Sequence, residues 1–233
     1  MRLAILSDLH ANEQALDAVA AELAERQPDA VVCLGDVVGY GPDPVPVLDR
    51  IRDLAAVVVK GNHDEAVATG EGLGALPPDG QVAAQRHRDE IGDERRRWLD
   101  GLPLVAEFEG VTLAHAAPRD PSDWPRLESY RAVQDQFGAF DTDLCFVGHS
   151  HRPAVVSSKI GVTRVRPGAR FLINVGSVGQ PRDRDPRAAF GILDTDPLSY
   201  ELVRVHYDVA ETVRRVQAAG LPQGLGARLA RGV

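Results

Sequence analysis

The residues in this sequence that could do chemistry lie in five short clusters, dominated by histidine, aspartate and asparagine. In chain order the clusters are Asp8-Leu9-His10, Gly35-Asp36, Gly61-Asn62-His63-Asp64, His115, and Gly148-His149-Ser150-His151. Five of the seven histidines of the chain lie in them. Carboxylate oxygen, imidazole nitrogen and amide oxygen are ligands of Mn, Fe, Zn and similar ions. The clusters contain no cysteine, so they predict a metal centre without thiolate ligands.

Two of the clusters place ligand-type residues two positions apart, at Asp8 and His10 and at His149 and His151. In an extended segment alternate side chains point to the same side, so each pair could face one ion. The glycines at 35, 61 and 148 would let the backbone turn sharply beside the ions. Each motif alone is common in ordinary loops, whereas the ordered combination predicts a dinuclear site.

Short apolar runs come before these clusters. Three of them predict buried strands, at 2–6, 30–34 and 56–59. Amphipathic helices are predicted between them, at 12–26 and 45–54. Buried strands that alternate with helices favour parallel pairing in βαβ units. Because the carboxyl ends of parallel strands border one crevice, we expect Asp8, Asp36 and Asn62 to meet there.

The middle of the chain has a different character. Residues 71–80 are rich in Gly and Pro and predict a loop, and 81–99 predicts a charged helix with His87 at the surface. We expect the segment at about 64–103 to be a helical insertion beside the core and not a separate domain.

The second half of the chain changes to antiparallel signals and predicts short strands, with a hairpin first. They are expected at 105–108, 111–115, 144–147, 154–158, 162–165, 171–175, 188–193 and 200–205. A helix at about 208–219 and a Gly-rich tail that frays would follow. The prediction is one α/β domain over residues 1–233, with a mixed sheet or two packed sheets.

Composition argues against several classes of protein. The net charge of −8 and the pI of about 5.4 disfavour binding to duplex nucleic acid, although bound cations could still admit a nucleotide. Cys33 and Cys145 lie outside any CxxC spacing and are expected to be buried free thiols. The longest apolar run, Ala55–Val59, is too short to span a membrane, and no signal peptide is apparent. A cytoplasmic protein is expected.

The ordered clusters resemble the calcineurin-like metallophosphoesterase superfamily, whose pattern is D-x-H, G-D-x-x, G-N-H-[DE], H and G-H-x-H. The match spans Asp8 to His151, and residues 174–182 are similar to the closing motif of its small bacterial and archaeal phosphodiesterase-like members. The resemblance implies a four-layer αββα sandwich with two mixed β-sheets. Two departures are visible. Ala116 stands where the family often has Gly, and 35–41 lacks the Arg with which protein serine/threonine phosphatases grip phosphate. The second departure argues against a phosphoprotein substrate.

The resemblance also implies roles for the clustered residues. One metal would be held by Asp8, His10, Asp36 and His151. The second would be held by Asp36, Asn62, His115 and His149. Asp36 would bridge two divalent ions, with manganese expected first and Fe, Zn, Ni, Co or Mg as alternatives. His63 would face the substrate as a general acid, oriented by Asp64.

The implied reaction is hydrolysis of a small phosphorylated molecule such as a nucleotide. Two cations about 3.5–4 Å apart lower the pKa of a bridging water and clamp the phosphoryl oxygens for in-line attack. No protein nucleophile is needed.

Arg182, together with Gln180, is a candidate substrate contact because a guanidinium matches phosphate geometry; the alternative is a tight turn with Arg182 in solvent. Tyr40 either stacks on a base or packs its loop, and Arg119 is similarly ambiguous. Two other functions stay open, a catalytically silent protein-interaction scaffold of the same fold and a nuclease. The sequence does not decide the oligomeric state or a preference for monoester, diester or anhydride.

Overall fold

The computed structural model describes residues 1–233 and contains two five-stranded sheets. The first consists, in spatial order, of β10 (Leu198–Val205), β9 (Ala188–Thr195), β1 (Arg2–Leu6), β2 (Ala30–Cys33) and β3 (Val57–Val58). The second consists of β4 (Val105–Phe108), β5 (Val111–Ala114), β6 (Leu144–Val147), β8 (Phe171–Asn174) and β7 (Ala154–Ser157).

Both sheets are mixed. In the first, β1, β2 and β3 pair in parallel, and β9 joins β1 antiparallel. In the second, the edge strands β4 and β7 are antiparallel to their neighbours, but β5, β6 and β8 pair in parallel. The antiparallel expectation for the second half of the chain is therefore wrong for these three strands. The parallel strands of both sheets carry the loops that hold the clustered residues.

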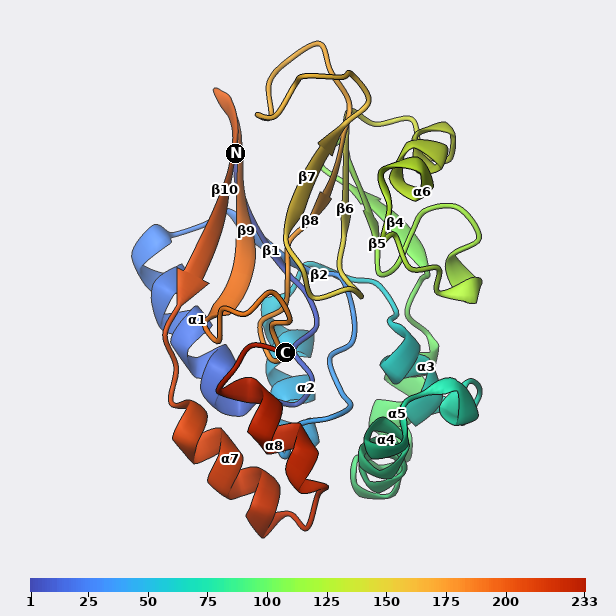
Figure 1. Ribbon diagram of the computed structural model, residues 1–233, viewed down its shortest axis with the longest axis vertical. Coiled ribbons are helices and arrows are strands. Elements are labelled where there is room, and N and C mark those ends of the chain that lie inside the picture. The colour runs from blue at the N-terminus through green and yellow to red at the C-terminus, as the bar shows by residue number, and fades with distance from the viewer.

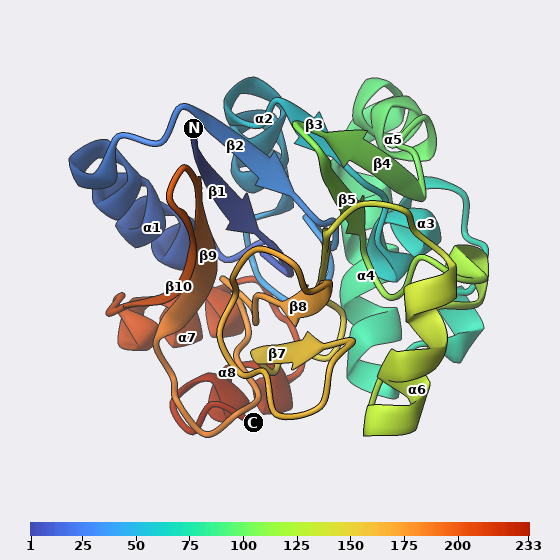
Figure 2. The ribbon, with the colours of Figure 1, turned by 90° about the horizontal axis from the view of Figure 1, so that it is seen from above.

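Helices cover the two outer faces. The helices α1 (Glu13–Arg26) and α2 (Pro44–Leu54) share a hydrophobic core with the first sheet. The short helix α6 (Tyr130–Gln134) and the 3₁₀ turn η3 (Asp135–Gly138) lie on the outer side of the second. Figure 1 and Figure 2 both show α1 and α6 on opposite sides of the sheets. The predicted four-layer sandwich is confirmed.

Alternate residues along each strand face two different hydrophobic cores. In β1, Ala4 and Leu6 face the helices, whereas Leu3 and Ile5 belong to the core between the sheets. The second sheet meets them with residues that include Phe146. Apolar residues on both faces explain why β1 is a continuous apolar run in the sequence.

The middle of the chain forms α3 (Asn62–Ala68), the turn η1 (Leu73–Ala75), α4 (Pro78–Glu90) and α5 (Gly92–Asp100). The helix predicted at 81–99 is therefore interrupted, because Gly92, the first residue of α5, adopts a φ of +76°. Buried Val67, Ile91 and Leu99 join the same core as α1 and α2.

Two local predictions were wrong. Residues 162–165 form no strand, since Gly161 and Gly168 take left-handed φ values of +79° and +81° within the loop between β7 and β8. The C-terminal segment is ordered rather than frayed. After α7 (Val209–Ala218) it forms α8 (Gln223–Leu229), whose Leu225 and Leu229 are buried. No helix here has the length and apolarity needed to cross a membrane.

Candidate metal centre

The five clusters meet at one edge of the two sheets, where parallel strands end. Asp8 and His10 follow β1, and Asp36 follows β2. The other members come from the start of α3 and from the loops after β5 and β6: Asn62, His115, His149 and His151. The strand-end argument predicted this meeting for Asp8, Asp36 and Asn62, and the family resemblance implied it for the three histidines.

The ligand-type atoms form two groups that share one residue. Asp8, His10, Asp36 and His151 each offer one atom within 4.8 Å of the others, and so do Asp36, His115 and His149. Asp36 Oδ2 lies 3.6 Å from His10 Nε2 and 3.4 Å from His115 Nε2. Its carboxylate therefore lies between the two groups, as a bridging ligand would.

Main-chain carbonyl groups orient three of the imidazole rings. The Nδ1 atoms donate over 2.6–3.0 Å, from His10 to Val38, from His115 to Leu34 and from His151 to Gln180. Burial lowers the pKa of His10 and of His151, so both rings are neutral. Their Nε2 atoms must then present lone pairs to each other across 3.1 Å. A cation between them would turn this repulsion into coordination, so the rings fit a metal site.

Two buried oxygen atoms support the same conclusion. Asp8 Oδ1 and Asn62 Oδ1 accept no hydrogen bond, although both are shielded from solvent. An unpartnered buried oxygen is costly, most of all on a carboxylate. Both belong to the seven residues expected to be metal ligands, and a hard cation would satisfy them.

His115 differs from the other rings. Burial alone would lower its pKa, but the adjacent Asp36 carboxylate outweighs burial and raises the pKa of His115 to about 9. A protonated imidazole cannot ligate a metal, so binding a cation here would release a proton. Affinity for the cation should therefore fall as the pH falls.

The backbone at the ligands is strained rather than extended. Asp8, His10, Asp36, His149 and His151 all have left-handed φ values, between +47° and +64°. The expectation that each pair converges by extended alternation was therefore wrong, because the chain turns as soon as its strand ends. Such conformations cost of order 1–3 kcal/mol each and cluster at functional sites.

Asp64 does not touch the ring that it was expected to orient. Its carboxylate accepts hydrogen bonds from the main-chain N–H groups of Asp36, Val37, Val38 and Gly61, at 2.7–3.3 Å. His63 Nδ1 has no hydrogen-bond partner. Asp64 therefore holds the loop that carries Asp36, and its effect on His63 is indirect.

His63 lies at the wall of the site. Its main-chain N–H donates to Asp36 Oδ1 over 2.8 Å, and its ring centroid is 4.3 Å from that of Tyr40. Burial lowers the pKa of His63 to about 4. The ring is therefore neutral at pH 7.

His87, expected at the surface, is fully buried behind the site. It accepts a hydrogen bond from the Gly39 N–H over 2.9 Å, and its Nε2 donates to the Gly41 carbonyl over 2.9 Å. Both contacts hold the loop that carries Tyr40. The sequence contained a signal for this burial, since small residues at 80, 83 and 84 share one helical face with position 87.

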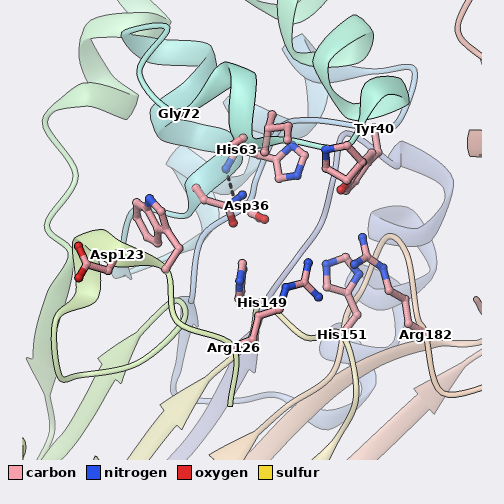
Figure 3. A pocket seen from close by; sticks show the side chains of 14 residues that line it. Asp36, Tyr40, His63, Gly72, Asp123, Arg126, His149, His151 and Arg182 are labelled. Carbon is pink, nitrogen blue, oxygen red and sulfur yellow. Dashed lines mark hydrogen bonds between the residues drawn. The ribbon is translucent and has the colours of Figure 1, made fainter. Parts of the chain in front are cut away.

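A cavity of about 230 Å³ opens over the ligands. Tyr40, His63 and Arg182 line it together with Asp36, Asn62, His149 and His151. Further lining residues, which the sequence did not single out, are Asp123, Trp124, Arg126 and the segment around 72–77. No local pattern marks them, because only the tertiary fold brings their loops over the site (Figure 3).

The remaining candidates for substrate contact lie outside this cavity. Gln180 is buried, and its Oε1 accepts hydrogen bonds from Arg182 Nη2 and Nε at 2.7 and 3.3 Å. Gln180 therefore positions Arg182. Arg119 is exposed and donates to the Asp135 carbonyl over 3.2 Å, away from the cavity. Neither is placed to contact a ligand at the metal centre.

Residues 1–197 match the calcineurin-like phosphoesterase superfamily domain. The chain belongs to this family. Its relatives include an uncharacterized protein of Methanocaldococcus jannaschii, MJ0912, which is 38% identical over 97% of this chain and 96% of that protein. The phosphodiesterase YfcE of Escherichia coli is 26% identical over 85% of this chain and 90% of that one.

Among solved structures, a metallophosphoesterase from Sphaerobacter thermophilus has a TM-score of 0.89 to this metallophosphoesterase and 36% sequence identity. The similarity covers 100% of this chain and 99% of that chain. The chain therefore shares its whole architecture with an enzyme-family relative.

Proposed function

We propose that this metallophosphoesterase holds two divalent cations and hydrolyses a phosphoester bond of a small molecule. Manganese is the cation that we expect first. The observation that carries the proposal is the pair of ligand groups joined by Asp36. The relationship to an E. coli protein named as a phosphodiesterase supports the reaction class.

The residues divide the work between holding cations and handling the substrate. Asp8, His10, Asp36 and His151 would hold one cation, and Asp36, Asn62, His115 and His149 the other. A cation pair supplies charge neutralisation at the phosphoryl group and a lowered pKa for water. The strained, hydrogen-bonded loops fix the ligands in place beforehand, so little reorganisation is needed on binding.

His63 would act on the leaving oxygen. A neutral ring donates a hydrogen bond to that oxygen, and the negative charge of a bound phosphate raises the pKa of the ring towards protonation. The protonated ring could then act as a general acid, which is worth about 10²–10⁴-fold in rate. Nδ1 is buried beside Gly39, so Nε2 would be the atom that meets the leaving oxygen.

Arg182 would neutralise phosphoryl charge. Its guanidinium is held by Gln180 and lies 5.5 Å from the centroid of the Tyr40 ring, at the wall of the cavity. A guanidinium held in this way loses little entropy when it binds an anion. Arg126 lines the same cavity and could share this role.

Activity on a generic diester tests the proposal. Manganese should stimulate hydrolysis of bis(p-nitrophenyl) phosphate, and both EDTA and Asp36→Asn should abolish it. Asp53→Asn is a matched control, because Asp53 is exposed on α2. If manganese-loaded wild-type protein were inert towards a broad panel of phosphoesters, the proposal would fail.

A further inference from the structure

A second cavity of about 260 Å³ lies beside the first. Arg126 and Arg182 line both cavities, so the second begins where the wall of the metal centre ends. Together the two have a volume within the roughly 300–1,000 Å³ typical of small-molecule sites. Nothing in the proposed mechanism uses the second cavity.

The floor of this cavity is the outer face of the second sheet. Val147 of β6, Val156 of β7 and Leu172 of β8 line it, and each alternates with a neighbour that faces the core between the sheets. The five-residue helix α6 contributes only Val133. Because α6 is so short, the cavity reaches the sheet here. Val156 is only partly buried, whereas Val147 and Leu172 are nearly closed off from solvent.

The rim of the cavity is cationic. Arg126, Arg152 and Arg182 line it against a single carboxylate, Glu128. Arg152 donates through Nε to the Arg182 carbonyl, and Arg126 Nη1 lies 3.6 Å from Glu128. An occupant should therefore be anionic at the end that meets the metal centre and apolar at the end that rests on the sheet.

The position of His63 indicates which substituent of a substrate would point into the second cavity. Figure 3 shows His63 and Arg126 on opposite sides of the first cavity, with Asp36 and His149 between them. A leaving group that receives a hydrogen bond from His63 must point away from Arg126. The substituent on the Arg126 side is then the one that stays on phosphorus.

We propose that the second cavity binds the retained substituent of a phosphodiester, and that this substituent has an apolar, ring-bearing part. The inference rests on the proposed function, since it places the phosphoryl group at the metal centre. Arg126 and Arg182 hold the charged phosphate at the junction, and the partly buried Leu127 and Val156 contact the ring. A nucleoside has this chemistry, with hydroxyl groups that the Ser150 hydroxyl at the cavity wall can meet.

Two diesters with the same leaving group test the proposal. Thymidine 5′-(p-nitrophenyl phosphate) and methyl p-nitrophenyl phosphate differ only in the retained substituent. The manganese-loaded wild type should show a kcat/KM at least tenfold higher for the thymidine ester. Ala154→Trp, at an exposed position on edge strand β7 that lines the second cavity, should remove this preference while hydrolysis of the methyl ester continues.

Ala210→Trp is the matched control, because it makes the same change at an exposed alanine on α7 and should keep the preference. Equal kcat/KM for the two esters in the wild type, or an undiminished preference in Ala154→Trp, would overturn the proposal.

A binding measurement separates this inference from the reaction. Calorimetry with thymidine 5′-monophosphate and methyl phosphate should give at least tenfold tighter binding of the nucleotide to manganese-loaded wild type, lost in Ala154→Trp. If both diesters resisted hydrolysis but this difference held, the proposed function would fail and the site would stand. Equal affinity for the two ligands would contradict the proposed binding site in the second cavity.

Discussion

The histidines of this chain differ in what surrounds them, and the differences set their chemistry. His10 and His151 are neutral with their Nε2 atoms facing each other, whereas His115 is charged by its proximity to Asp36. His63 has a free Nδ1 atom and lines the cavity, whereas both ring nitrogens of His87 are bonded to the backbone. Ligand, substrate-facing and structural roles therefore follow from the partners of each ring.

Replacing His63 should separate catalysis from metal binding. His63→Gln removes the group that would act on the leaving oxygen, so kcat should fall by about 10²–10⁴-fold. The manganese content of the protein should stay the same, since the ring is not among the ligand groups. Steady-state kinetics and elemental analysis on the same preparation check both points. A variant with wild-type kcat would contradict the assigned role.

Replacing His87 should cost stability in a pH-dependent way. His87→Leu leaves a buried N–H unpaired, at about 1–3 kcal/mol, and a partly buried carbonyl unpaired at a smaller cost. Burial lowers the pKa of His87 to about 3, so the unfolded chain binds a proton that the folded chain does not as the pH falls below about 6.5. The wild type should therefore lose stability on acidification more steeply than the variant, by about 1.4 kcal/mol per pH unit.

Urea denaturation of metal-free protein between pH 7 and pH 4.5 measures this difference. Parallel pH profiles for the two proteins would show that His87 is not a buried neutral ring.

The sequence could identify site residues where a motif marks them, but it could not predict their hydrogen-bond partners. Asp8, Asp36 and Asn62 could be placed together from the sequence because their loops follow strands expected to be parallel, whereas His149 was added by the family resemblance. The partners of Asp64 could not, since four N–H groups from two loops converge on it only after folding. Arg126 lies in a loop without any pattern and enters the cavity through tertiary packing.

At the scale of elements, the loop after β2 connects the metal centre to α4. His87 of α4 accepts a hydrogen bond from this loop at Gly39. Tyr40 of the same loop packs against the His63 ring. Gly39 has a φ of +88°, and a side chain added there would clash with the His63 ring. The conformation of one loop therefore sets the position of the substrate-facing histidine.

Replacing Gly39 with alanine should lower kcat as well as stability. Gly39→Ala and Gly92→Ala both place a side chain at positive φ, which costs roughly 1–2 kcal/mol in each case. Only Gly39→Ala displaces the His63 ring, because nothing lies within 4 Å of a Cβ at Gly92. Thermal unfolding should show a loss for both variants, larger in Gly39→Ala because of the clash, and kcat should fall at least tenfold only in Gly39→Ala. Equal kcat in the two would refute this coupling.

Element types were predictable where periodicity was strong. The strands β1 and β2 and the amphipathic helix α1 agree with the sequence patterns. In each of them the spacing of the apolar residues matches the residues that the fold buries. The loop at 158–170 was misread at 162–165, since two valines separated by polar residues also suit a loop that packs on the sheets. The C-terminal α8 was missed because two buried leucines in a glycine-rich segment give a weak period.

For the whole molecule, cation binding and folding should be coupled. The two sheets and the helical segment around α3 all contribute ligand-type residues, so a bound cation would link them. A ligand that binds only the folded state stabilises it, by about 2.7 kcal/mol at a concentration 100 times its Kd. The unfolding midpoint should rise with manganese concentration in the wild type. Asp36→Asn should show little rise, and a similar rise in both would contradict a centre at Asp36.

Anomalous scattering from crystals grown with manganese tests the central claim most directly. We predict two manganese peaks per chain, one among Asp8, His10, Asp36 and His151 and the other among Asp36, Asn62, His115 and His149. The separation should be about 3.5–4 Å, the usual spacing of a two-metal site. A single peak, or peaks that do not share Asp36, would contradict the account.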